Sequence, residues 1–131
     1  EQATATLTLK FNSDHIYMYV DTGKSDIAVV TNAKIDLTHY KELIIDWEGE
    51  AGAAPAAMYA RVVISSSKTE GYSTGTLLGE RSGNFSRRLD RYNIEDITGG
   101  YYIRVHRCYD ARNSNNNYWS STRIYTISLG F

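Results

Sequence analysis

The chain has 131 residues, 42% of them hydrophobic, which is about one domain in length and enough apolar material for one core. Fourteen Lys+Arg against fifteen Asp+Glu give a net charge of −1. This balance argues against a general nucleic-acid binder and against a binder of anionic membranes, because both usually carry a basic excess. The single cysteine, Cys108, excludes an intramolecular disulfide and a cysteine-rich zinc site.

Hydrophobic residues alternate with polar ones at a period of two along nearly the whole chain, which predicts β-strands. The first predicted strand covers residues 4–11, where leucine and phenylalanine alternate with threonine and lysine. The further predicted strands cover residues 15–20, 27–31, 43–48, 57–66, 84–89, 101–107 and 122–129. Only residues 37–41 and 93–97 have a helical pattern, and each is one turn at most. Short strands separated by turn signals predict an all-β, antiparallel β-sandwich of jelly-roll type, as one domain over residues 1–131.

No segment of the sequence has the pattern of a signal peptide or a membrane span. The first thirty residues contain several charges, among them Asp14, Lys24 and Asp26, and no long apolar run. The chain opens at Glu1 directly on strand-like sequence, which suggests a module cut from a longer protein.

Eleven of the sixteen aromatic residues are tyrosines, and a polar loop at residues 110–121 contains or adjoins several aromatic side chains. Sugar recognition needs aromatic faces for the C–H-rich side of a pyranose and planar polar groups for its hydroxyls. The candidate sugar-binding residues of this loop are Tyr109, Asn115, Asn116, Asn117, Tyr118 and Trp119. The alternative is that Trp119 caps one end of the sandwich and that the asparagines only form turns.

Strand parity indicates a second candidate site, because successive side chains of a strand point to opposite faces. If Ile103 and Val105 face the core, the residues between them face outward, and the same reasoning applies to the neighbouring strands. The outward group predicted in this way consists of Asp46, Tyr59, Arg61, Tyr102, Arg104 and His106. Its arginines could donate several hydrogen bonds to vicinal hydroxyls, with a carboxylate to hold them in place. The alternative is an ordinary solvated sheet face with cross-strand ion pairs.

Sequence patterns typical of catalysis are missing. There is no Gly-x-Ser-x-Gly, His-Glu-x-x-His or phosphate-binding loop, and the three histidines lack metal-ligand spacing. Asp46, Glu48 and Glu50 alternate along one strand, which fits a polar edge as well as it fits glycosidase carboxylates. Cys108 follows a predicted strand and is expected to be a small buried hydrophobe rather than a nucleophile. We therefore predict that the chain is not an enzyme.

No cofactor is expected, and structural calcium is a weak alternative. Carboxylates at loop positions could contribute to a calcium site. The aspartates concerned are Asp21, Asp26, Asp90 and Asp96. They have no EF-hand spacing, and turn formation explains them more simply.

Three segments in the back two-thirds of the chain resemble accessory modules of bacteriophage tail and baseplate proteins. Residues 35–47 read IDLTHYKELIIDW and resemble the "idLtnYktL" segment that leads into a strand in that family. Residues 96–105, DITGGYYIRV, look like its "dis-l-sG-yYI-v" strand, and residues 124–129, IYTISL, look like its closing strand. The three segments occur in the order expected for the family.

The resemblance implies a jelly-roll carbohydrate-binding module of a distal-tail, tail-associated or receptor-binding protein from a phage of Gram-positive bacteria. It further implies binding to the cell-wall polysaccharide of a bacterial host during adsorption, contact with other tail subunits, and an extracellular location on the virion. The family has no fixed binding motif, so the candidate residues above come from this sequence alone. The alternative function is a protein-contact module whose tyrosine-rich surface packs against other subunits without binding sugar.

Overall fold

The computed structural model describes residues 2–3, 8–11, 14–20, 26–52, 58–69, 74–82, 84–109 and 120–131. Its first strands are β1 (Gln2–Ala3), β2 (Thr8–Phe11), β3 (Ile16–Val20), β4 (Asp26–Val30) and β5 (Ile35–Asp36). The later strands are β6 (Glu42–Ala51), β7 (Met58–Ser65), β8 (Thr76–Ser82), β9 (Phe85–Asn93), β10 (Gly100–Tyr109) and β11 (Ser120–Gly130). Every predicted strand is present, although residues 4–7 of the first one and residue 57 of the fifth lie outside the described residues.

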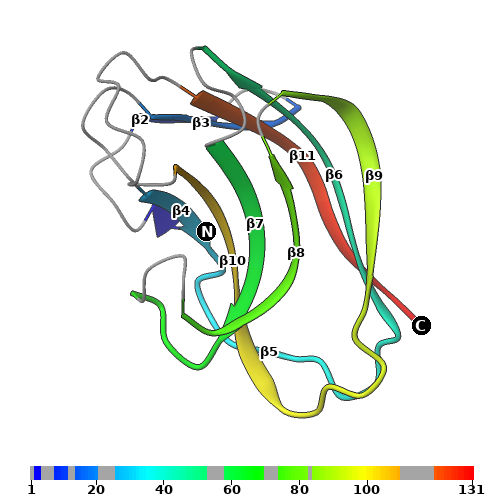
Figure 1. Ribbon diagram of the computed structural model, residues 1–131. Coiled ribbons are helices and arrows are strands. Elements are labelled where there is room, and N and C mark those ends of the chain that lie inside the picture. Colours follow the sequence, from blue (N-terminus) through cyan, green and yellow to red (C-terminus); the bar gives the residue numbers. More distant parts are fainter. Residues whose placement is uncertain are drawn as a thin grey trace.

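The strands form two antiparallel sheets that pack face to face (Figure 1). The first sheet has the order β1-β4-β10-β7-β8, with β5 also paired to β10, and the second has the order β2-β3-β11-β6-β9. Neighbours within each sheet are mostly distant in sequence, as expected for a jelly roll, in which the chain crosses repeatedly between the sheets. The prediction of an antiparallel β-sandwich is confirmed.

The two short helical patterns form single turns, as expected. Tyr40 N donates to Leu37 O at 3.1 Å, and Ile97 N donates to Ile94 O at 3.0 Å. In the described part of the chain, no helix has the length and apolar character needed to cross a membrane.

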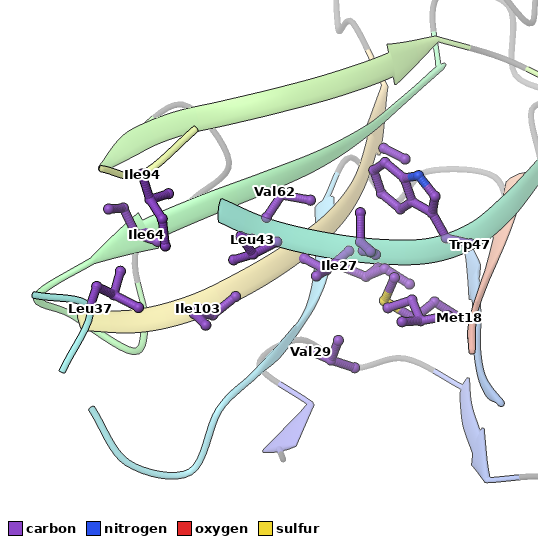
Figure 2. Packing of buried hydrophobic residues seen from close by; sticks show 14 residues of the cluster. Met18, Ile27, Val29, Leu37, Leu43, Trp47, Val62, Ile64, Ile94 and Ile103 are labelled. Carbon is purple, nitrogen blue, oxygen red and sulfur yellow. The ribbon is translucent and has the colours of Figure 1, made fainter. Parts of the chain in front are cut away.

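The hydrophobic core lies between the two sheets, and the period-two alternation of the sequence directs side chains into it. On β6, Leu43, Ile45 and Trp47 have no exposed surface, whereas the residues between them face outward. Figure 2 shows Trp47 close to Met18 of β3 and Ile27 of the opposite sheet. Burial of each such side chain stabilises the fold by about 1.5–3 kcal/mol.

The sequence does not predict β8, and its glycine gives the reason. Gly79 weakens the strand pattern because glycine has low strand propensity and no side chain to pack. In the structure, a Cβ at Gly79 would overlap the ring of Tyr92, which crosses from β9 toward β8. The glycine therefore makes room for a ring from the other sheet, and this contact is invisible in the local sequence.

The interior is polar at the end where β10 finishes and β11 starts. Arg107 is fully buried on the inward side of β10, and its Nη2 donates to the carbonyl oxygen of Glu50 in the opposite sheet at 2.9 Å. Burial lowers the pKa of Arg107 to about 10, because desolvation disfavours the charged guanidinium. Ser120 and Thr122 are also buried there, on the inward side of β11.

Candidate functional site

The outer face of the first sheet is concave, because the centres of β7 and β8 bow toward the second sheet (Figure 1). We call this outer face the concave face. Three strands meet on it in direct register: His106 of β10 lies opposite Arg61 of β7, and Arg61 lies opposite Glu80 of β8. Tyr59 and Tyr102 occupy the same face, two residues from Arg61 and four from His106 along their strands.

The structure confirms the outward orientation of all six residues but contradicts the prediction that Asp46 shares a sheet face with the other five. Asp46 belongs to β6 in the second sheet, so it lies on the opposite side of the sandwich. There it accepts two hydrogen bonds from Arg87, at 3.1 and 3.0 Å. Parity predicts the side of a strand on which a residue lies but not the sheet to which the strand belongs, and this explains the error.

A second correction concerns Arg104 and His106, which were expected on an exposed face. Both point away from the core, but only 0% and 1% of their surfaces are exposed. Val30 of β4 and Val63 of β7, which flank Arg104 on the same face, are equally buried, so the concave face has little accessible surface around Arg104. Cys108 is also fully buried there, as expected for a small hydrophobe, with its Sγ 3.7 Å from Tyr59 O.

The accessible part of the concave face contains a compact group that we call the Tyr59–Arg61–Glu80 cluster. Arg61 Nε donates to Glu80 Oε2 at 2.6 Å, and the Arg61 guanidinium carbon lies 5.1 Å from the centroid of the Tyr59 ring. The side chains of Arg61 and Glu80 are 20% and 38% exposed. The ion pair holds a planar donor group beside an aromatic ring, which is a combination suited to a hydroxyl-rich sugar ring.

Most candidate residues of the asparagine-rich loop lie outside the described residues. These are Asn115, Asn116, Asn117, Tyr118 and Trp119. Tyr109 is the last residue of β10, and its backbone pairs with Met58 of β7, although its side chain is not described. β10 therefore ends beside Tyr59, at the same end of the sheet as the Tyr59–Arg61–Glu80 cluster.

The opposite end of the concave face holds two lysines that sequence reasoning missed. The Nζ atoms of Lys34 and Lys68 lie 5.9 and 5.5 Å from the centroid of the Tyr102 ring. Lys34 follows β4 and Lys68 follows β7, so only the pairing of both strands with β10 brings them to Tyr102. Glu80 was missed for a different reason, because β8 lacks a recognisable strand pattern.

The outer face of the second sheet gathers a separate set of aromatic and charged side chains. The Arg123 guanidinium carbon lies 4.8 Å from the Tyr17 ring centroid, and the Arg87 guanidinium carbon lies 3.6 Å from that of Tyr125. Tyr125 Oη donates to Glu48 Oε1 at 2.8 Å. These contacts form a continuous surface across β3, β11, β6 and β9, and we call it the Tyr17–Tyr125 face.

The structure also bears on the calcium alternative. The carboxylate of Asp90 accepts hydrogen bonds from Arg81 and from Trp47 Nε1. Asp21 lies outside the described residues, as does the side chain of Asp26. Within the part of the chain that is described, no three His, Cys, Asp or Glu side chains group as metal ligands would.

Comparison with known proteins identifies the fold. No family model and no curated protein sequence matches the chain. Among solved structures, it is similar to a family 29 carbohydrate-binding module, with a TM-score of 0.58 and 15% identity over 95% of this chain and 77% of the other.

Two further solved structures agree with this result. The C-terminal family 6 carbohydrate-binding module of LamC from Zobellia galactanivorans has a TM-score of 0.50 and 12% identity, over 95% of this chain and 91% of that module. The K1 cleaved adhesin domain of Lys-gingipain from Porphyromonas gingivalis has a TM-score of 0.52 and 17% identity, over 83% and 73% of the two chains. The chain therefore has the jelly-roll fold of carbohydrate-binding modules.

Proposed function

We propose that this chain is a non-catalytic carbohydrate-binding module and that the accessible part of its concave face contacts the sugar. The observation that carries the proposal is the Tyr59–Arg61–Glu80 cluster, in which Arg61 is held by Glu80 at 2.6 Å and lies beside the Tyr59 ring. Such a guanidinium is already ordered before the ligand arrives, so binding costs less conformational entropy. The similarity of the fold to carbohydrate-binding modules supports the same proposal.

Alanine variants on the two faces of the sandwich test this site. A glycan array identifies a ligand, and calorimetry then compares the wild-type chain with Tyr59→Ala and Arg61→Ala. Each substitution is expected to weaken binding at least about tenfold. Arg91→Ala is the matched control, because it breaks an exposed Arg–Glu pair of 2.7 Å on the second sheet. Equal binding by all four proteins would show that the cluster is not the site.

The loop residues remain a second part of the proposed site. The double substitution Tyr118→Ala with Trp119→Ala removes two aromatic rings that could stack on a sugar. We expect a loss of binding comparable to that of Tyr59→Ala, since β10, which the loop follows in the sequence, ends beside Tyr59. Binding that persists unchanged in the double variant would remove these residues, and the neighbouring Asn115–Asn117, from the site.

The proposed biological role is adsorption of a phage to a Gram-positive host. The resemblance of residues 35–47, 96–105 and 124–129 to tail and baseplate modules supports this role. The module would act outside the cell, on the virion, where several copies engage the cell wall together. Multivalent attachment can raise apparent affinity about 10²–10⁴-fold, so a weak single site is sufficient.

A fluorescent fusion of the chain tests adsorption directly. The fusion is expected to label cells of a Gram-positive host, and purified wall polysaccharide should compete for the labelling. A second assay measures release of reducing ends from the same polysaccharide, and we expect none. Labelling that purified polysaccharide cannot displace would argue against this role, and release of reducing ends would contradict the non-catalytic proposal.

The second candidate function is a contact with another protein, and the Tyr17–Tyr125 face favours it. Tyrosine and arginine are enriched at the energetic centres of protein interfaces. On this face Tyr17 of β3 lies beside Arg123 of β11, and Tyr125 of β11 lies beside Arg87 of β9. If this function is correct, Tyr17→Ala with Tyr125→Ala should abolish assembly with other tail subunits in co-purification, and Tyr59→Ala should leave assembly intact.

A further inference from the structure

Lys34 and Lys68 bracket one tyrosine ring at the end of the concave face remote from Tyr59. Their Nζ atoms lie 5.9 and 5.5 Å from the centroid of the Tyr102 ring. Cation–π contact with one ring face contributes only about 0.5–1 kcal/mol at exposed sites, so the ring compensates little of the charge. Two like charges thus lie beside the same ring.

The positions of both lysines are set by the backbone around them. Thr31 N donates to Ile103 O at 3.0 Å, and Ile103 N donates to Thr31 Oγ1 at 3.1 Å, which ties the segment before Lys34 to β10. Ser67 N donates to Ser65 Oγ at 3.0 Å, which shapes the turn before Lys68. Lys68 Nζ also donates to Asn32 Oδ1 at 3.4 Å, so the segments after β4 and β7 are linked by side chains.

The charges at this end differ from those elsewhere on the sandwich. On the second sheet, Arg87 and Arg91 each pair with a carboxylate, at 3.0 and 2.7 Å. On the concave face, Arg61 pairs with Glu80. Among the residues that the structure describes, no carboxylate forms an ion pair with Lys34 or Lys68. The net charge of −1 for the whole chain therefore conceals a local positive site beside an aromatic ring.

We propose that Lys34, Lys68 and Tyr102 bind an acidic group of the polysaccharide, so that the ligand is an anionic rather than a neutral glycan. This inference rests on the proposed sugar-binding function of the concave face. Tyr59 and Tyr102 are separated by about six residues of strand, which corresponds to roughly 20 Å, so the two ends of the concave face would contact different units of one polysaccharide. A carboxylate of a uronic acid and a phosphodiester both offer the oxygens that two ammonium groups bind.

The test compares matched acidic and neutral polymers at low and high salt. The probes are polygalacturonate with its fully methyl-esterified form, and poly(glycerol phosphate) with polyglycerol, and the two pairs separate the carboxylate source from the phosphate source. We expect the chain to bind at least one acidic polymer more tightly than its neutral partner. Lys34→Ala with Lys68→Ala should weaken that binding about three- to tenfold, with less effect at high salt.

Two control variants test whether the lysine charges cause the preference, and the binding pattern of the wild-type chain separates this inference from the proposed function. Lys34→Arg with Lys68→Arg keeps both charges and should retain the preference, and Lys41→Ala removes an exposed lysine just before β6 and should change nothing. Equal binding of acidic and neutral polymers by the wild-type chain would overturn the anionic-ligand proposal while sugar binding stands. Binding to none of the four polymers, nor to any member of a glycan array, would overturn both.

Discussion

The indole Nε1 of Trp47 donates a hydrogen bond of 2.8 Å to Oδ2 of Asp90 inside the sandwich. The same carboxylate accepts two hydrogen bonds from Arg81, at 2.9 and 2.7 Å, and Arg88 lies 3.4 Å from its Oδ1. Arg81 belongs to β8 and Asp90 to β9, which are the edge strands of the two sheets. Asp90 therefore connects Trp47 in the core to Arg81 in the opposite sheet.

The substitution Asp90→Asn is expected to destabilise the fold. A neutral amide cannot pair with the Arg81 charge, and it can satisfy only part of the existing hydrogen bonds. Because the Arg81 side chain is 35% exposed, solvent screens part of the ion pair, and we expect a loss of about 1–2 kcal/mol. Urea unfolding measures it. Arg91→Ala, which breaks an exposed ion pair, should cost less than about 1 kcal/mol.

The same aspartate predicts loss of stability in acid. The hydrogen bonds from Arg81 hold the pKa of Asp90 below its ordinary value of 3.8. A folded-state pKa below the unfolded one gives stability that is fully present above pH 3.8 and is lost as the pH falls through the folded pKa. Unfolding free energy measured from pH 6 to pH 2 should therefore fall less steeply for Asp90→Asn than for the wild type. Parallel curves for the two proteins would contradict this assignment.

The buried hydroxyl of Tyr92 is expected to cause a loss of folding stability at alkaline pH. This hydroxyl is buried and, within the described structure, has no hydrogen-bond partner. Burial raises the pKa of Tyr92 to about 12. A raised folded-state pKa gives stability that is present below pH 10 and is lost as the pH rises toward 12. Tyr92→Phe should be as stable as the wild type or more stable at pH 7, and should lose less stability between pH 10 and 12.

The close packing of the Tyr92 ring against Gly79 predicts that a side chain at position 79 destabilises the fold. A Cβ at Gly79 would overlap the Tyr92 ring, so Gly79→Ala should destabilise the fold by about 1–3 kcal/mol. Gly100→Ala is the control, because a Cβ there would lie 3.6 Å from Lys34 Cβ, which is an ordinary contact. Thermal melting of both variants gives the comparison, and equal midpoints would show that the ring moves aside without cost.

Metal removal should leave the protein unchanged. Asp90 accepts hydrogen bonds from Arg81 and Trp47, which calcium would have to displace in order to bind there. We expect the melting temperature and glycan binding to be the same in EDTA and in millimolar CaCl₂. An increase in melting temperature with calcium, reversed by EDTA, would instead support a structural ion, because a ligand that binds only the folded state stabilises it.

The three segments that resemble phage tail modules lie mainly in strands of the two sheets. Residues 35–47 run from β5 into β6, and residues 96–105 and 124–129 lie largely in β10 and β11. β5 pairs with β10 and β6 pairs with β11, so the three segments occupy neighbouring strands of the two sheets. Such segments are informative about the fold because core positions tolerate few side chains, but they carry little information about the ligand.

The sequence by itself determined the fold class, the strands with clear alternation and the face on which each of their side chains lies. Those properties follow from local backbone geometry, since successive side chains of a strand point to opposite sides. It predicted Tyr59 and Arg61 on one face correctly for this reason.

Only the tertiary structure decided which strands share a sheet and which outward residues are accessible. It separated Asp46 from Arg61, buried Arg104 and His106, and brought Lys34 and Lys68 to Tyr102. Strand pairing and coverage depend on contacts between residues far apart in the chain, and no local pattern encodes them. The fold class could therefore be predicted from the sequence, while the composition and charge of the candidate site depended on the strand order.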